Sequence, residues 1–241
     1  MANWTWHAKP TGSYSMGSTG GDDNACLIAS MLMLDYGWTL EAVSGMIGNI
    51  AGEGGLNPWR WEDDNVQSYS SAQTTSKGMG LIGWTPARKY CDPTNSYFPE
   101  WDLSTFDGYG PNFSDRTGNT RDGRAQTELI GKCMVGRGHR NFWILGRSDI
   151  HGNTYNVRAE DYITETDVAY AAKVWLWEAE WPSSIHPPHD PTDTENRRIG
   201  YARAWYQHFI DIGFEPSPES WDVNLMMLIF KKIIQNNNGG M

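Results

Sequence analysis

The sequence predicts an α+β, mostly helical protein with a small irregular β-sheet or loop region beside a cleft. Several segments carry apolar residues at helical spacing between capping residues and glycines. From Asn57 to about Pro86 this period disappears, and Trp, Ser, Thr, Asp and Gly dominate. The chain has 241 residues, of which 39% are hydrophobic and 20% are charged, so it can bury a sizeable core.

The predicted organisation has three parts. These are an extended N-terminal arm at 1–24, one domain at 25–213, and an apolar helix with a disordered tail at 214–241. The arm is rich in Gly, Ser and Thr, and no internal repeat is evident in the domain. The C-terminal helix is expected to pack on the core or on a partner. A membrane-surface segment is the less favoured alternative, because only Lys231 and Lys232 supply positive charge there.

Two helices are expected at the start of the domain, over 21–38 and 39–55. The residues that can cap the first helix are Asp22, Asp23 and Asn24. Thr39 is expected to cap the second helix, and Gly54-Gly55 to terminate it. Further along, helices are expected over 85–90, 124–135, 164–181 and 194–213, with a surface insertion over 92–123.

Composition argues against several classes of function. The net charge of −10 disfavours a nucleic-acid partner, which would require a basic face. The N-terminus shows no secretory h-region, and the longest apolar run, Leu225 to Phe230, is too short to span a bilayer. We therefore expect cytoplasmic synthesis without a signal peptide, and no stable membrane span. Cys26, Cys91 and Cys133 suggest free thiols, with one disulfide and a spare thiol as the alternative.

No pattern in the sequence indicates a cofactor or a metal. The glycine-rich pieces at 17–21 and 136–140 match no phosphate-binding loop. The segment from His186 to Asp190 offers possible ligands but no evident third one. We therefore expect chemistry carried by side chains alone.

Glu53 is the strongest candidate for such chemistry. It ends the second predicted helix, where the helix macrodipole disfavours an ionised carboxyl. Trp59, Trp61 and Trp84 are expected to supply apolar walls that desolvate it and favour the protonated form needed by a general acid. The 13 Trp and 11 Tyr can equally build a core, and a solvated Glu at a helix end is the structural alternative.

The segment "YGWTLEAVSGMIGNIAGEGGLNPWRW…GMGLIGWTPARKY" resembles the phage tail lysozyme family. Its pattern is roughly G-W-T-x-x-A, G-N-x-x-x-E-S/T-x-x-N-P and G-x-G-L-x-Q-W-T-P. "WEAEWP" resembles the Y-E-R-P segment of the family, with Glu180 and Pro182 in register, and 195–209 resembles the helix that follows it. The resemblance covers roughly 25–210. In the two first motifs the matching positions are Gly37, Trp38, Thr39, Ala42, Gly48, Asn49, Glu53, Asn57, Pro58, Gly78, Gly80, Leu81, Trp84, Thr85 and Pro86.

The resemblance implies a lysozyme-like fold and cleavage of the bond between N-acetylmuramic acid and N-acetylglucosamine in bacterial peptidoglycan. It implies that Glu53 is the general acid and that the aromatic segment after it floors the sugar cleft. The expected substrate-binding residues are Trp61, Trp84, Thr85 and Glu180. It also implies a place in the phage tail and action on the host cell wall. Contacts with other tail proteins are then expected through the C-terminal helix.

Two positions depart from the family pattern. Gly54 stands where a hydroxyl residue usually follows the Glu, and Gly83 replaces the Gln of G-L-x-Q-W-T. Each change removes a side chain able to hydrogen-bond the acid or the substrate, a loss that slows catalysis by about 10²-fold or more. We therefore expect a slow enzyme, a different sugar, or a cleft that binds glycan without cutting it.

The sequence does not decide which residue supplies the second carboxyl of the site. Glu62, Asp63 and Asp64 follow Glu53 at a spacing that suits a hairpin folding back across a cleft, and Asp64 is our choice among them. A solvated acidic turn is the alternative. If no acid lies close, an inverting or intramolecular mechanism is expected.

Glu180 also has two interpretations. It is expected to brace the cleft by pairing with Arg197 or Arg198, with direct substrate contact as the alternative.

Two rival functions remain for the whole chain. One is a catalytically impaired virion structural or glycan-binding protein, and the other is a lytic transglycosylase.

Overall fold

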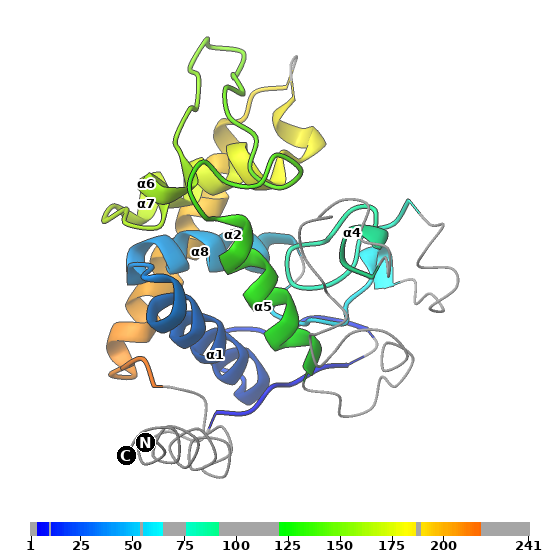
Figure 1. Cartoon of the computed structure of the whole chain (residues 1–241), viewed down its shortest axis with the longest axis vertical. Coiled ribbons are helices and arrows are strands. Elements are labelled where there is room, and N and C mark those ends of the chain that lie inside the picture. The colour runs from blue at the N-terminus through cyan, green and yellow to red at the C-terminus, as the bar shows by residue number, and fades with distance from the viewer. Residues whose placement is uncertain are drawn as a thin grey trace, which may run out of the picture.

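The computed structural model describes residues 4–9, 11–53, 55–64, 76–91, 121–186 and 189–217. Within these ranges the chain is a helical assembly, as Figure 1 shows, and the predicted mostly helical class is confirmed. The α-helices are α1 (Thr19–Tyr36), α2 (Leu40–Glu53), α4 (Arg88–Cys91), α5 (Arg121–Cys133), α6 (Ala159–Tyr162), α7 (Val168–Trp175) and α8 (Thr192–Asp211). The short elements are the 3-10 helices η1 (Glu62–Asp64) and η5 (Ser183–Ile185) and the π-helix η4 (Leu176–Glu180).

The helix α2 is the centre of the packing, in contact with α1, α7 and α8. Two glycines on α2 allow the close crossings. A side chain on Gly45 would collide with Ala171 of α7, and one on Gly48 would collide with the backbone of Ala202 of α8. The sequence therefore places small residues where two helices approach α2, and Glu53 ends that helix.

The start of α1 differs from the prediction. The helix begins at Thr19 after Ser18, whose hydroxyl accepts a backbone N–H from the first turn. The prediction of a cap at Asp22, Asp23 or Asn24 was wrong, because all three residues lie inside the helix and their side chains bind other groups. Asp22 contacts His208 of α8, and Asp23 contacts His7 of the arm, each at 2.9 Å.

The boundary between α1 and α2 agrees with the prediction, whereas the start of α8 does not. Gly37 adopts φ 71° and ends α1, and the Thr39 hydroxyl accepts the Ala42 N–H at 3.1 Å to cap α2. The last helix begins at Thr192, ahead of the predicted cap Thr194, and Gly213 follows its end with φ 62°.

The predicted small β-sheet is not confirmed. Within the described residues, the segment after α2 forms isolated antiparallel bridges from Met79 to Trp61 and to Trp84. The Trp84 N–H donates to the Met79 carbonyl at 2.8 Å, and the Glu62 N–H donates to the Gly78 carbonyl at 3.0 Å. Turns between these single pairs keep the region irregular, and it lies to the right of the helices in Figure 1.

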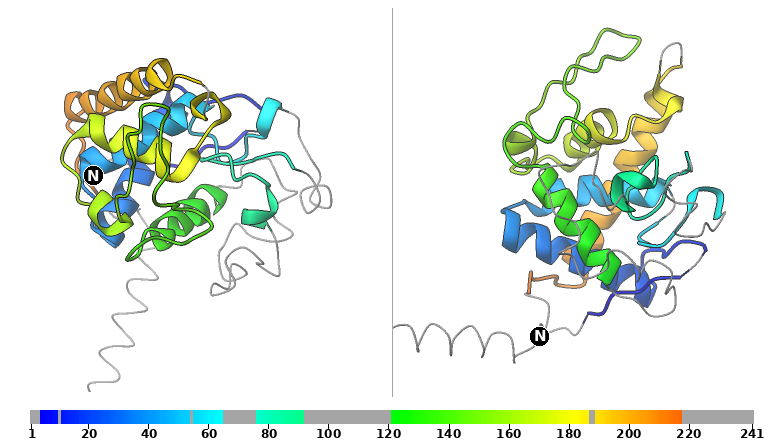
Figure 2. Two further views of the ribbon diagram at one scale, coloured as in Figure 1. Left: turned by 90° about the horizontal axis from the view of Figure 1, so that it is seen from above. Right: turned by 45° about the vertical axis from the view of Figure 1, so that its right-hand side comes forward.

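The N-terminal arm reaches the same side of the molecule, as the views in Figure 2 show. The Asn57 side-chain amide donates to the carbonyls of Lys9 and Gly12, at 2.9 and 2.7 Å. Most of the predicted insertion and all residues from 218 onward lie outside the described residues. The division of the chain into arm, domain and C-terminal segment therefore stays a prediction.

The tryptophans are mainly packing residues. Those at most 8% exposed are Trp6, Trp38, Trp59, Trp61, Trp84, Trp143, Trp175, Trp177 and Trp205. Trp175 contacts the rings of Trp38, Trp143, Tyr162 and Phe142, so these five rings form one continuous cluster. Cys26 and Cys133 are buried free thiols. None of the described helices is long and apolar enough to cross a membrane.

Candidate active site

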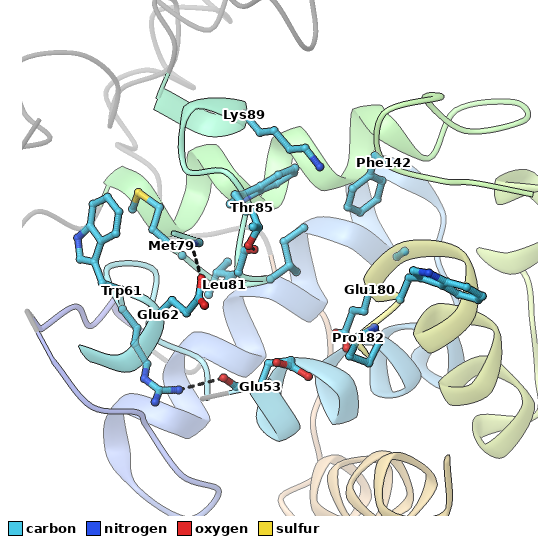
Figure 3. Close-up of a pocket in the computed structure, with 18 of the residues that line it drawn as sticks. Glu53, Trp61, Glu62, Met79, Leu81, Thr85, Lys89, Phe142, Glu180 and Pro182 are labelled. Atoms are coloured by element: carbon cyan, nitrogen blue, oxygen red, sulfur yellow. Dashed lines mark hydrogen bonds between the residues drawn. The ribbon is translucent and has the colours of Figure 1, made fainter. Parts of the chain in front are cut away.

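A cavity of about 670 Å³ opens between the end of α2 and the irregular segment. Figure 3 shows side chains from several elements facing it. Its walls come from the end of α2, the segments 60–63 and 78–85, Lys89 of α4, the loop at 141–142, and 179–182 at the end of η4. The cavity brings together Glu53, Trp61, Trp84, Thr85 and Glu180, all predicted as site residues.

Glu53 occupies the last position of α2 and faces the cavity. Its side chain is 44% exposed, and one carboxylate oxygen is bound by Arg198. The backbone carbonyl of Glu53 accepts a hydrogen bond from Arg60 at 3.0 Å, which fixes the end of the helix. The expected apolar enclosure is therefore only partial, because a guanidinium and open space lie beside this carboxyl.

The tryptophans predicted as walls divide into two groups. Trp61 and Trp84 line the cavity, whereas Trp59 is buried away from it. The side chains of Trp61 and Trp84 are only 2% and 3% exposed, so they shape the wall without offering an open face for stacking. Thr85 is exposed at the rim, and its hydroxyl donates to the Gly83 carbonyl at 2.7 Å.

Glu180 is the most deeply buried carboxyl of the cavity wall. It ends η4, the π-helix that continues α7, and its side chain is 6% exposed. Burial raises the pKa of Glu180 to about 8, with Arg198 opposing and the charge of Glu53 adding to that rise. The Trp175 indole N–H lies near this carboxyl and also opposes the rise in its pKa, but the two groups do not have the geometry of a normal hydrogen bond.

Arg198 of α8 joins the two glutamates, and of the two predicted partners the structure selects it over Arg197. Its side chain is 2% exposed, and its Nη2 binds Glu53 and lies 3.7 Å from Glu180 Oε2. Its Nη1 donates to the Asn49 carbonyl at 3.1 Å. A side chain on Gly52 would occupy the position of this guanidinium, so Gly52 leaves room for it.

Asp64, the predicted second acid, is not part of the cavity wall. Its Oδ1 accepts the Gly12 N–H at 2.8 Å and contacts Arg60 Nε at 3.1 Å. The hydrogen bond from Gly12 is the main reason that the pKa of Asp64 lies below its usual value. Glu62 and Asp63 of the same turn do line the cavity. Glu62 Oε2 accepts the Gly78 N–H at 2.8 Å, and Asp63 contacts Lys77 at 2.5 Å.

Gln126 of α5 supports the wall and was missed by the sequence analysis. Its Oε1 accepts the Leu81 N–H and its Nε2 donates to the Pro58 carbonyl, both at 2.8 Å. It therefore connects α5 to the cavity segment at 78–85 and to Pro58, which precedes the segment at 60–63. A buried Gln within a predicted helix gives no sequence signal for this role, because its partners are backbone groups distant in the chain.

The carboxyls of this cavity are suited to proton transfer and to stabilising positive charge. Glu53 and Glu180 lie side by side, and Glu62 faces the cavity from another wall (Figure 3). Within the described ranges, no cluster of His, Cys, Asp and Glu has the geometry of a metal site. The His186 ring nitrogen instead contacts the Trp181 carbonyl at 2.9 Å.

Comparisons with known proteins place these residues in a family context. A family model described as phage tail lysozyme matches residues 23–209. The chain is 27% identical over 164 residues to Morphogenesis protein 1 of Bacillus phage B103. That alignment covers 68% of this chain and 35% of the phage protein, so this chain spans about a third of the length of its relative. Glu53, Glu180 and Arg198 all fall within the range of the family match.

Proposed function

Because this chain belongs to the phage tail lysozyme family, we propose that it is a muramidase. Its substrate is bacterial peptidoglycan, cut at the glycosidic bond between N-acetylmuramic acid and N-acetylglucosamine. The observation that carries this proposal is the position of Glu53. This residue ends α2 and presents a half-exposed carboxyl to a cavity of about 670 Å³ walled by Trp61 and Trp84. Its sequence motif also resembles the one that carries the glutamate of the family.

In this mechanism Glu53 donates a proton to the leaving glycosidic oxygen, and positive charge develops on the sugar ring. A second carboxylate stabilises that charge or activates water. Glu62 is better placed than Asp64 for this task, because it lines the cavity on another wall (Figure 3). A catalytic role for Asp64 stays a prediction with less support, since Gly12 and Arg60 occupy its carboxylate. Thr85 supplies a polar contact to the sugar at the rim of the cavity. Direct contact of Glu180 with the sugar is the less supported alternative, because its carboxyl is buried beside Arg198.

We also propose that the protein is carried by the phage particle, in or near the tail, and acts on the host cell wall. The family description and the phage relative support this location. No cofactor takes part in the proposed reaction. Binding to other tail proteins through the C-terminal segment remains a proposal from the sequence, since that segment lies outside the described residues.

The proposal is tested with Glu53→Gln on purified cell walls. The variant keeps the shape of the side chain but cannot donate the proton, so turbidity loss is expected to slow by about 10²–10⁴-fold. Glu160→Gln is the matched control, because Glu160 is exposed on α6 and pairs with Arg158 away from the cavity. Equal hydrolysis by wild type and Glu53→Gln would refute the role of Glu53.

A lytic transglycosylase is the second candidate function. The observation in its favour is that Asp64 is held by the arm and does not reach the cavity, which leaves room for a reaction without a carboxylate nucleophile. Mass spectrometry of the products separates the two, since hydrolysis gives reducing ends and the transglycosylase gives anhydro-muramyl ends. Wall binding with no product at all would identify an impaired, glycan-binding protein.

A further inference from the structure

The two glutamates of the cavity share one arginine. Arg198 Nη2 binds Glu53 and lies 3.7 Å from Glu180 Oε2, while its Nη1 is fixed on the Asn49 carbonyl. The carboxyls come from the ends of α2 and η4, so two separate elements converge on one guanidinium. The same nitrogen, Nη2, therefore lies within ion-pair distance of both carboxyls.

The charge of this cluster favours the uptake of one proton. Arg198 and Glu180 are almost fully buried, whereas Glu53 is 44% exposed. With both carboxyls ionised, the charge of buried Glu180 would be only partly compensated, because its guanidinium is also bound to Glu53. Such a charge is costly, and one proton removes it. Among the described residues, Tyr162 of α6 is the further titratable group that interacts with Glu180. Its hydroxyl donates to the Ala42 carbonyl, and burial holds its pKa well above the ordinary value, so it stays neutral.

In the resting protein the structure places this proton on Glu180. Neither oxygen of its buried carboxyl makes a hydrogen bond within the described residues, whereas Glu53 is half-exposed and bound by Arg198. The rise in the pKa of Glu180 to about 8 agrees with this placement. The resting cluster is therefore neutral, with a carboxylic acid at Glu180 and an ion pair between Arg198 and Glu53.

We propose that Glu53 and Glu180 share one proton and one guanidinium, and that both exchange between the two carboxyls during turnover. This inference rests on the proposed function of Glu53. The Glu180 proton passes to Glu53, and the Arg198 N–H changes its hydrogen bond from Glu53 to Glu180. Glu53 becomes the neutral acid facing the substrate, and Glu180 becomes the buried partner of Arg198. Glu180 acts through Glu53 and is a positioning residue.

The remaining steps balance without any other reactant. Glu53 gives its proton to the glycosidic oxygen, the bond between that oxygen and the sugar carbon breaks, and the electron pair stays on the oxygen. Water adds to the sugar carbon and returns one proton to the carboxyl pair. The exchange explains how a carboxyl next to an arginine serves as a proton donor, because the arginine moves to the other carboxyl when the proton arrives.

The first experiment compares the pH dependence of kcat in Glu180→Gln and Glu178→Gln. Wild-type activity is expected to fall as pH rises through about 8, where Glu180 loses its proton. Glu180→Gln is expected to lose about 10²-fold at neutral pH and to regain activity in acid, where solvent protonates Glu53. Glu178→Gln is the matched control, a buried glutamate of the same η4 that does not line the cavity. It is expected to keep the wild-type pH profile.

A change in KM with an unchanged pH profile of kcat in Glu180→Gln would overturn the inference, because it would show simple sugar binding. Circular dichroism of each variant establishes that it is folded. If Glu53→Gln itself retains full activity, the proposed function fails. If only the Glu180 results disagree, the shared proton alone is refuted.

The second experiment does not depend on activity. Infrared spectroscopy of the free protein at pH 7 reports the C=O band of a protonated carboxyl. All proteins carry Glu178→Gln, because burial raises the pKa of Glu178 to about 7 and would add a second band. The band is expected to vanish in Glu180→Gln and also in Glu53→Gln, where Arg198 is free to pair with ionised Glu180. A band that survives Glu53→Gln would contradict proton sharing.

Discussion

Gly52 precedes the candidate acid, and its lack of a side chain decides where Arg198 lies. A methyl group at this position would coincide with the guanidinium, which is held on the Asn49 carbonyl and on Glu53. Gly52→Ala is therefore expected to displace Arg198. Displacing this buried guanidinium breaks its hydrogen bond to the Asn49 carbonyl and its ion pair with Glu53, which costs about 1–3 kcal/mol in the free energy of unfolding. Hydrolysis is expected to fall as well.

Gly200→Ala is the matched control for this change. Gly200 is an exposed glycine within α8, and a methyl group there would meet no atom within 4 Å. Because alanine favours a helix more than glycine does, this variant is expected to gain about 0.5–1 kcal/mol and to keep full activity. Urea unfolding and turbidity assays measure both variants. Equal behaviour of the two alanines would show that Arg198 does not need the space at Gly52.

For single residues, the sequence predicted some residues of the cavity wall and not others. Glu53, which lines the cavity, could be predicted because a carboxyl at a helix end within a family-like motif is a local pattern. The choice between Arg197 and Arg198 was not possible, since neighbouring helix positions face directions about 100° apart and only packing fixes which one turns inward. Gln126 was not found because its partners are backbone groups more than forty positions away.

Among the elements, the acidic turn η1 and the arm form one structural unit. Asp64 holds the arm through the Gly12 N–H, while Glu62 of the same turn faces the cavity. Glu62→Gln is therefore expected to lower kcat by about 10²-fold or more. Asp64→Asn is expected to retain most of the activity and to make the arm more accessible to proteases. Cell-wall digestion and limited proteolysis measure the two effects. Loss of hydrolysis in Asp64→Asn with a protected arm would restore Asp64 as the second acid.

The predictability of the elements follows from how local their signals are. The ends of α1 and α2 at Gly37 and Thr39 were predicted, since capping depends on neighbours in the sequence. The start of α1 was misplaced because Asp22 and Asp23 contact distant histidines. The expected sheet is limited to single bridges in the described part of the segment, where glycine turns at 80 and 83 interrupt the pairing.

Considered as a whole, the molecule combines a net charge of −10 with two buried glutamates at the end of one helix. Burial raises the pKa of Glu178 to about 7 and of Glu180 to about 8, from an ordinary value of 4.5. The pKa of Asp64 is instead lowered, because the hydrogen bond from the Gly12 N–H stabilises the ionised carboxylate. These opposite shifts act on stability in different pH ranges.

Between about pH 5 and 8 the folded protein is therefore expected to hold protons that the unfolded chain has released. The free energy of unfolding falls as pH rises through this range, because a folded state that binds more protons loses stability when protons are removed. Below about pH 4 the trend reverses as carboxylates such as Asp64 become protonated. Urea unfolding at a series of pH values measures the slope. The double variant Glu178→Gln/Glu180→Gln is expected to have a flatter slope, whereas the control Glu160→Gln is expected to have the slope of the wild type. A stability that instead rises from pH 5 to 8 would mean that both glutamates are ionised in the folded protein, and the neutral cluster around Arg198 would then lose its physical basis.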